Sequence, residues 1–187
     1  MTLEWLNLLL RWVHVIFGVM WIGQTYLFNW MERVLTPPDN PEAKPNISGE
    51  LWMVHGGGFY LVEKQKWPAL MPRTLHWFKW EAGITWITGV LLLAVVYWAG
   101  SPLLEYGSGV GRATGIGLSL GVLVGGFIVY NLIWNSPLGN NEGVGIVVSW
   151  LLIIGLAYAL QGWLSDRAVY LHIGAMFGTI MAANVWM

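Results

Sequence analysis

Cysteine is absent from this 187-residue chain, and charged residues make up only 10% of it. The missing cysteine excludes disulfides, iron–sulfur ligation, zinc sites of the cysteine type and covalent haem attachment through a C-x-x-C-H motif. Soluble domains usually carry about 25% charged residues. The net charge of −1 gives no indication of a nucleic-acid partner. These absences exclude most soluble classes and direct attention to the apolar residues.

Long apolar runs dominate what remains. A helix needs about 20 apolar residues to cross the hydrocarbon core of a bilayer. Five stretches of such length contain no Asp, Glu, Lys or Arg, and the 14 Trp residues suit a membrane–water interface. The first run is too long for a cleavable signal peptide and lacks a basic leading segment. We therefore expect an all-α integral membrane protein, a five-helix transmembrane bundle forming a single domain over 1–187, with helices at about 3–31, 76–98, 112–134, 143–163 and 167–186.

The connections differ greatly in length. The first, over 32–75, is long: its proline-rich part 36–50 forbids a long helix, and its mixed part 51–74 is expected to lie along the membrane surface. The others are short, which favours an up-and-down bundle for the last four helices. Lys and Arg are concentrated in and around the first connection, six against three on the other side. The positive-inside rule then predicts a cytoplasmic first loop and an N-terminus on the opposite side of the membrane.

Two histidines, His14 and His172, fall inside apolar runs. An ionisable residue within a membrane span is costly to keep and suggests function. Arg11 should reach the outer interface, which puts His14 roughly 5 Å deeper, while Asp166 puts His172 roughly 8 Å deep at 1.5 Å per residue. Similar depths suit two axial ligands of one b-type haem, with Gly18 clearing space and Arg11 pairing with a propionate. The alternative for each histidine is a hydrogen-bonded packing residue, and zinc is disfavoured because no further ligand lies at that level.

A second candidate cluster lies on the cytoplasmic side. His55 precedes three glycines, Tyr60 follows them, and His76 and Glu81 stand at the inner end of the second helix. Glycines let the backbone turn sharply or approach a ligand. We expect His55, Tyr60, His76 and Glu81 to line a catalytic pocket for a planar polar substrate. The alternatives are a plain loop for the glycines and an interfacial anchor for the charges near Glu81.

Several stretches, in this order, resemble one known family. They are LNLLLRWVHVIFGVMWIGQTYLFNW, GELWMVHGGGFYLVEK, TLHWFKWEAGITWITGVLLL, YNLIWNSPLG and HIGAMFGTIMAANV, and together they extend over nearly the whole chain. The family is that of the bacterial membrane-bound urate hydroxylases, in its membrane (urate oxidase N-terminal) domain. Family members carry further spans and then a periplasmic cytochrome c domain, so the chain corresponds to the first five spans only.

The resemblance implies an oxidoreductase that hydroxylates urate at the cytoplasmic side, with water as the oxygen source. Electrons would pass through haem b to a cytochrome c or cytochrome c domain, and the protein would serve purine catabolism. A different class of function remains open: a non-catalytic haem-binding or structural membrane subunit of a larger electron-transfer complex. The partners expected in either case are the lipid bilayer, a cytochrome c and other membrane subunits.

Overall fold

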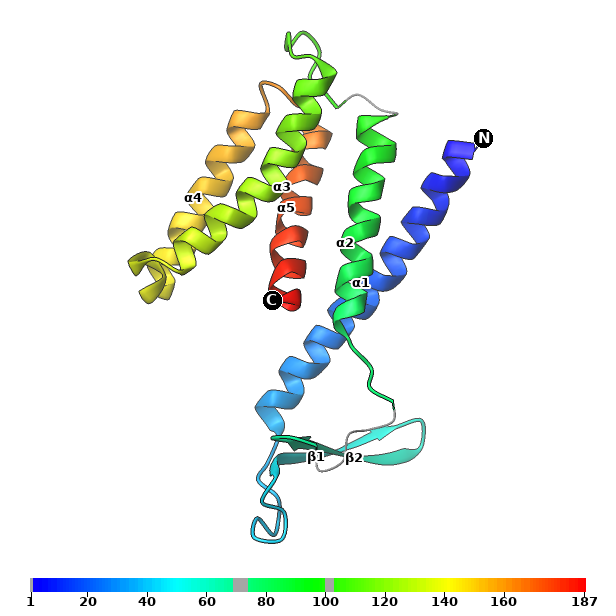
Figure 1. Cartoon of the computed structure of the whole chain (residues 1–187), viewed down its shortest axis with the longest axis vertical. Helices are drawn as coiled ribbons and strands as arrows, with labels where there is room; N and C mark the ends of the chain where they lie inside the picture. Colours follow the sequence, from blue (N-terminus) through cyan, green and yellow to red (C-terminus); the bar gives the residue numbers. More distant parts are fainter. Residues whose placement is uncertain (1, 69–73, 100–102) are drawn as a thin grey trace. The chain divides into compact units, whose positions relative to one another are not determined.

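The chain is described by a computed structural model, which covers residues 2–68, 74–99 and 103–187. The five expected helices are present, and a β-hairpin separates the first from the second (Figure 1). The chain divides into two compact units, one of Met1–Gly18 with Lys79–Met187 and one of Val19–Phe78. The elements are α1 (Thr2–Val34), β1 (Ile47–His55), β2 (Gly58–Gln65), α2 (Lys79–Leu93) continued by the π-helix η1 (Ala94–Trp98), α3 (Arg112–Trp134), the 3-10 turn η2 (Pro137–Asn140), α4 (Glu142–Leu160) and α5 (Asp166–Trp186).

Each of the five helices, counting α2 and η1 together, is long and apolar enough to cross a membrane. Their outer surfaces remain apolar: in α1, Met31 alone of the described residues is buried, and α4 buries only Gly145 and Leu160. An apolar surface of this kind suits contact with lipid and is costly in water. The expected helical membrane architecture thus agrees with the length and surface of the helices.

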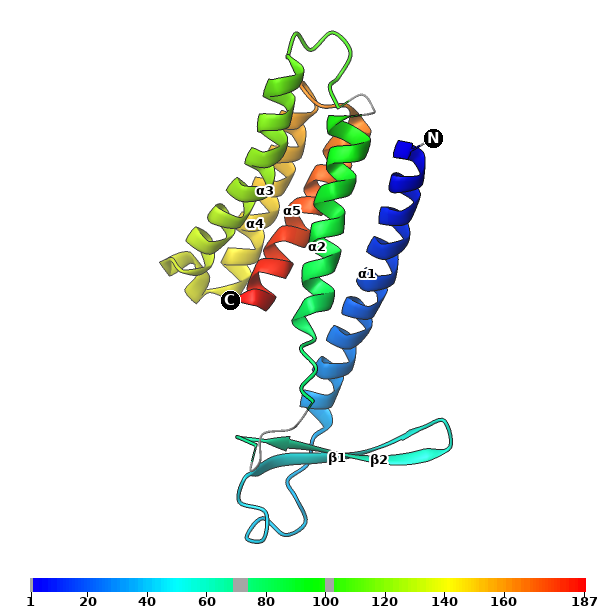
Figure 2. The ribbon, with the colours of Figure 1, turned by 45° about the vertical axis from the view of Figure 1, so that its right-hand side comes forward.

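Helices α2 to α5 form the up-and-down arrangement that the short connections predict. Consecutive helices run in opposite directions, and α5 packs against α2, α3 and α4 (Figures 1 and 2). The helix starts are capped by side chains: Asn141 accepts from the Val144 amide, and Ser165 accepts from the Ala168 amide. Such caps satisfy amide groups that a helix end leaves without partners. The helix boundaries therefore follow local sequence signals.

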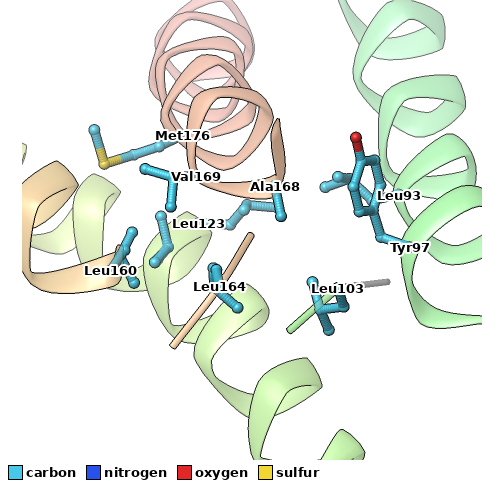
Figure 3. Close-up of a cluster of buried hydrophobic side chains, with 10 residues drawn as sticks. Leu93, Tyr97, Leu103, Leu123, Leu160, Leu164, Ala168, Val169 and Met176 are labelled. Carbon is cyan, nitrogen blue, oxygen red and sulfur yellow. The ribbon is translucent and has the colours of Figure 1, made fainter. Parts of the chain in front are cut away.

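The core of this unit lies where α5 meets α3, the end of α2 and the α4–α5 connection (Figure 3). Leu164 in that connection is fully buried, and it pairs with Leu104 through an isolated β-bridge. A Cβ at Gly126 of α3 would lie 2.3 Å from Cγ of Met176, so the glycine makes room for the methionine. The buried cluster is completed by Leu93, Tyr97, Leu103, Val122, Leu123, Leu160, Ala168 and Val169.

The last turn of α2 widens into the π-helix η1. Short π segments insert one extra residue per turn and often occur at functional sites. Here the segment ends in Tyr97, which is buried, and Trp98, whose indole reaches α3. The widened turn therefore supplies two aromatic side chains to the interior of the bundle.

The first connection contains a β-hairpin that the sequence analysis did not predict. β1 and β2 pair antiparallel from Glu50↔Glu63 to His55↔Gly58. The turn between them has Gly56 at φ 57° and Gly57 at φ 80°. Positive φ at both central residues is what a tight hairpin turn requires, and glycine adopts it without steric cost. The all-α description therefore holds for the five spans but not for this connection.

An ionic cluster ties the base of the hairpin to the preceding loop. Lys44 Nζ donates to Glu50 Oε2 and to Glu63 Oε1, each at 2.8 Å. These hydrogen bonds raise the pKa of Lys44 above its usual range, and the bond from Lys44 lowers the pKa of Glu50. Lys64 pairs with Glu32 at 2.6 Å, which connects β2 to the last turns of α1 within the same unit. The hairpin is therefore anchored by charge as well as by main-chain hydrogen bonds.

Candidate functional site

His14 on α1 is held by the main chain of α2. Its Nδ1 lies 2.9 Å from the carbonyl oxygen of Thr85 and 3.1 Å from Oγ1 of Thr88. A carbonyl oxygen can only accept, so Nδ1 must carry the proton and donate. The Thr88 hydroxyl already donates to the carbonyl of Ile84, at 2.7 Å, so it too accepts from His14. The imidazole therefore carries a proton on Nδ1, and both of its partners on α2 accept.

Two glycines lie where α1 and α2 meet, and only Gly89 is in tight contact. A Cβ at Gly89 would lie 3.1 Å from Cε1 of His14. Gly18, one turn below His14, would meet Cγ2 of Thr85 at 3.7 Å if it had a Cβ. Arg11, expected to pair with a haem propionate, instead donates from Nε to Oδ1 of Asn7 at 2.8 Å on the exposed surface. The haem-binding roles expected of Gly18 and Arg11 therefore both stay predictions.

His172 on α5 occupies a closed polar site in the bundle. Its side chain is fully buried, and Nδ1 lies 2.6 Å from the carbonyl of Ala168, one turn earlier. Nε2 is hydrogen-bonded to Oγ of Ser119 on α3, and Ser119 also accepts from Nε1 of Trp98 at 2.9 Å. The ring of Tyr97 packs edge-on to the imidazole, 6.2 Å between centroids. The hydrogen bonds thus run in one direction, from the Trp98 indole through Ser119 to His172.

The structure does not bring His14 and His172 together. His14 contacts α2 at Thr85, Thr88 and Gly89, whereas His172 contacts Tyr97. Thr88 and Tyr97 are nine residues apart in the chain, on the order of 13 Å along a helix axis. The sequence suggested that the two histidines lie at a common depth, whereas the structure puts them beside different parts of α2 and η1, in two separate sites.

These placements test the fit of a haem. Ligating histidines usually donate Nδ1–H to a carbonyl and present Nε2 to the metal. His14 meets that condition, with a half-buried ring and its Nδ1 occupied. His172 also donates from Nδ1, but its Nε2 is already hydrogen-bonded to Ser119 and cannot bind a metal at the same time. The residues therefore fit a haem ligand at His14, and they do not fit one ring shared by the two histidines.

No group of three or more His, Asp or Glu side chains in the described ranges is close enough to hold a metal ion. A multidentate protein site such as zinc requires such a group.

The predicted cytoplasmic pocket is distributed over both units. His55 and Tyr60 lie near the hairpin turn on the same face, since Tyr60 pairs with Met53, which is two residues from His55 on β1. The ring of Tyr60 packs over Gly58: a Cβ at Gly58 would lie 3.5 Å from Cε2 of Tyr60. Both side chains are exposed. The hairpin thus carries an imidazole and a phenol on one face, and their role in a common pocket stays a prediction.

The other two pocket residues lie around the start of α2. His76 packs edge-on to Phe78, with 4.6 Å between ring centroids. Glu81, in the first turn of α2, is 3% exposed and belongs to the helical unit, whereas His55, Tyr60 and His76 belong to the other. A pocket formed by all four therefore stays a prediction.

Sequence reasoning missed the residues that hold the two histidines. Thr85, Thr88 and Gly89 hold His14, and Ser119 with Trp98 holds His172. A signal for the first group existed: Glu81, Thr85 and Thr88 recur every three to four residues, which puts polar groups on one face of an apolar helix. Ser119 gave no comparable signal, because a single serine in a glycine-rich helix is usually interpreted as a small residue that allows close helix–helix packing.

The fold and the sites together define a class: a helical protein with five spans of membrane-crossing length and histidines set among them. The family model for the urate oxidase N-terminal family matches residues 1–187, the whole chain. The chain belongs to that family, as the sequence resemblance indicated. Neither the curated proteins nor the solved structures compared with the chain gave a match.

Proposed function

We propose that this chain is the membrane domain of a urate-hydroxylase-like oxidoreductase. It oxidises a planar purine at the cytoplasmic side of the bacterial inner membrane and delivers electrons through a b-type haem at His14 to a cytochrome c. The observation that carries the proposal is the family match over the whole chain. The spans of membrane-crossing length and the geometry of His14 support it.

The overall reaction adds one oxygen atom to the purine. Water supplies that oxygen, a carbon–oxygen bond forms, and two protons and two electrons leave. The haem supplies one-electron transfer towards the acceptor cytochrome. The hairpin residues His55 and Tyr60 offer a proton acceptor and a hydrogen-bonding phenol to the substrate.

The remaining residues have roles set by their position. Glu81 and His76 are assigned to substrate binding and proton transfer at the inner end of α2. His14 holds its proton on Nδ1 and keeps Nε2 as the metal-binding atom. His172 has no assigned role in this scheme beyond its buried hydrogen bonds.

The test is a visible spectrum of the purified chain in detergent, oxidised and reduced, followed by addition of urate. A haem spectrum that His14→Ala abolishes, and that urate reduces, is the expected result. His172→Ala should leave the spectrum in place. A wild-type chain without haem would refute the haem part, and a spectrum indifferent to urate would favour a non-catalytic haem-binding subunit.

A further inference from the structure

From this geometry we infer that Gly89 and Thr88 are positioning residues for His14. Gly89 uncovers the Thr85 carbonyl so that Nδ1 of His14 can reach it, and Thr88 adds a second acceptor. Together they fix the proton on Nδ1 and aim Nε2 away from α2. The inference rests on the proposed function where it concerns haem, and on hydrogen-bond geometry alone where it concerns the imidazole.

The first step is the accessibility of the Thr85 carbonyl. In an α-helix the carbonyl of one residue points at the amide of the residue four positions later. Each Cβ leans towards the helix N-terminus, so the side chain at that later position covers the carbonyl. For Thr85 that position is Gly89, which has no side chain. The oxygen can therefore accept a second hydrogen bond, from a neighbouring helix.

The second step is the fit of the imidazole over Gly89. A Cβ added there would lie 3.1 Å from Cε1 and 3.6 Å from Nδ1 of His14. These are the atoms that form the edge facing Thr85, which Nδ1 approaches to 2.9 Å. An alanine at 89 would force the ring to shift by a few tenths of an ångström from its position over the Thr85 carbonyl. Glycine thus allows the closest approach of the imidazole to this acceptor.

The third step is the role of Thr88. Its hydroxyl donates to main-chain carbonyls, with Oγ1 lying 2.7 Å from Ile84 O and 3.0 Å from Thr85 O. Its oxygen is left to accept from His14 Nδ1 at 3.1 Å. Both partners of Nδ1 are then acceptors. If the proton were on Nε2 alone, the lone pair of Nδ1 would face the lone pairs of the Thr85 carbonyl oxygen and the Thr88 hydroxyl oxygen, which is repulsive. The site therefore selects one tautomer.

The consequence for metal binding is quantitative. Loss of the group that orients a ligating histidine typically weakens metal binding about 10- to 100-fold. Gly89→Ala should weaken haem binding by about that factor. Thr88→Val should weaken it less, because the Thr85 carbonyl remains, and Thr88→Ser should restore wild-type binding. Gly121→Ala on α3 is the matched control, since a Cβ there meets nothing within 4 Å.

The experiment combines two measurements on the full chain in nanodiscs. One is a haem titration followed by visible absorption, for the wild type and the four variants. The other is the ¹⁵N spectrum of histidine-labelled chain without haem, with the His14 signals assigned by their loss in His14→Gln. We expect a protonated Nδ1 and an unprotonated Nε2 in the wild type and Gly121→Ala, and a mixture of tautomers in Gly89→Ala.

The outcomes separate this inference from the proposed function. A wild-type His14 protonated on Nε2, or a Gly89→Ala variant with unchanged ¹⁵N signals, would overturn the inference even if haem binds. Another outcome is a wild-type chain that binds no haem and still shows the expected tautomer, with that tautomer lost in Gly89→Ala. That result would support the positioning role and refute the haem part of the proposed function. Equal haem affinity in Gly89→Ala and the wild type would overturn the positioning role in ligation.

Discussion

Ser119 on α3 and His172 on α5 are hydrogen-bonded to each other at a point where both side chains are fully buried. Ser119 accepts from Trp98 and donates to His172, so it connects three elements of the bundle. Buried polar groups in an apolar bundle are stable only when they are paired. This pair accounts for a histidine in the middle of an apolar helix without any ligand.

Replacing Ser119 by Ala should destabilise the bundle by about 1–3 kcal/mol, because it leaves both the Trp98 indole and His172 Nε2 unpaired. Thermal unfolding in detergent measures the effect. Ser149→Ala is the control, since Ser149 bonds only to the carbonyl of Gly145 in its own helix. Equal melting temperatures for Ser119→Ala and the control would show that the hydrogen-bond chain contributes nothing.

The hairpin turn should reject a branched residue at Gly57. With φ at 80°, Gly57→Val should strain the turn by about 1–3 kcal/mol, the usual cost of a sparsely populated backbone conformation. Gly57→Asn should be tolerated, because asparagine enters the left-handed region more readily. Hydrogen exchange of the amides in β1 and β2 reports the difference. Equal protection in the two variants would contradict the assigned turn.

The ionic cluster at Lys44 should make the hairpin sensitive to acid and to strong base. The lowered pKa of Glu50 contributes stability above its ordinary value of 4.5, and this is lost as pH falls through the lower folded value. The raised pKa of Lys44 contributes below its ordinary value of 10.5, and this is lost as pH rises through the higher folded value. Stability should therefore be greatest between pH 4.5 and 10.5.

The measurement is the unfolding temperature of the hairpin, followed by Trp52 fluorescence from below pH 4.5 to above pH 10.5. The signal is isolated by comparison with Trp52→Phe. In Lys44→Met the loss of stability below pH 4.5 should shrink, because the largest cause of the Glu50 shift is gone. An unchanged acid transition in that variant would assign the effect to other groups.

The Lys and Arg distribution predicts which side of the membrane each connection faces. This can be tested with single cysteines, since the chain has none of its own. Glu42→Cys lies before the hairpin and Tyr106→Cys in the connection between η1 and α3, and both positions are exposed. In intact cells an impermeant thiol reagent should label Tyr106→Cys and spare Glu42→Cys. The reverse pattern would place the hairpin outside the cytoplasm.

The positions of the five helices were determined by the sequence itself. Apolar runs of membrane-crossing length can bury their main-chain polar groups only by forming helices, so their existence needs no tertiary information. The start of α5 was likewise visible in Ser165 and Asp166. The hairpin was missed because its strands mix charged and apolar residues, although the paired glycines of its turn are a recognised signal.

The partners of the histidines were decided by the tertiary structure. His14 and His172 look alike in the sequence, each an ionisable group in an apolar run. Their difference lies in groups 71 and 53 residues away, the Thr85 carbonyl and the Ser119 hydroxyl. Every residue has a main-chain carbonyl, so the sequence does not indicate which one will accept a bond from a histidine. Here the missing side chain of Gly89 leaves the Thr85 carbonyl accessible to His14. Helix periodicity fixes which residues share a face, but the approach of a second helix decides which of those faces a histidine meets.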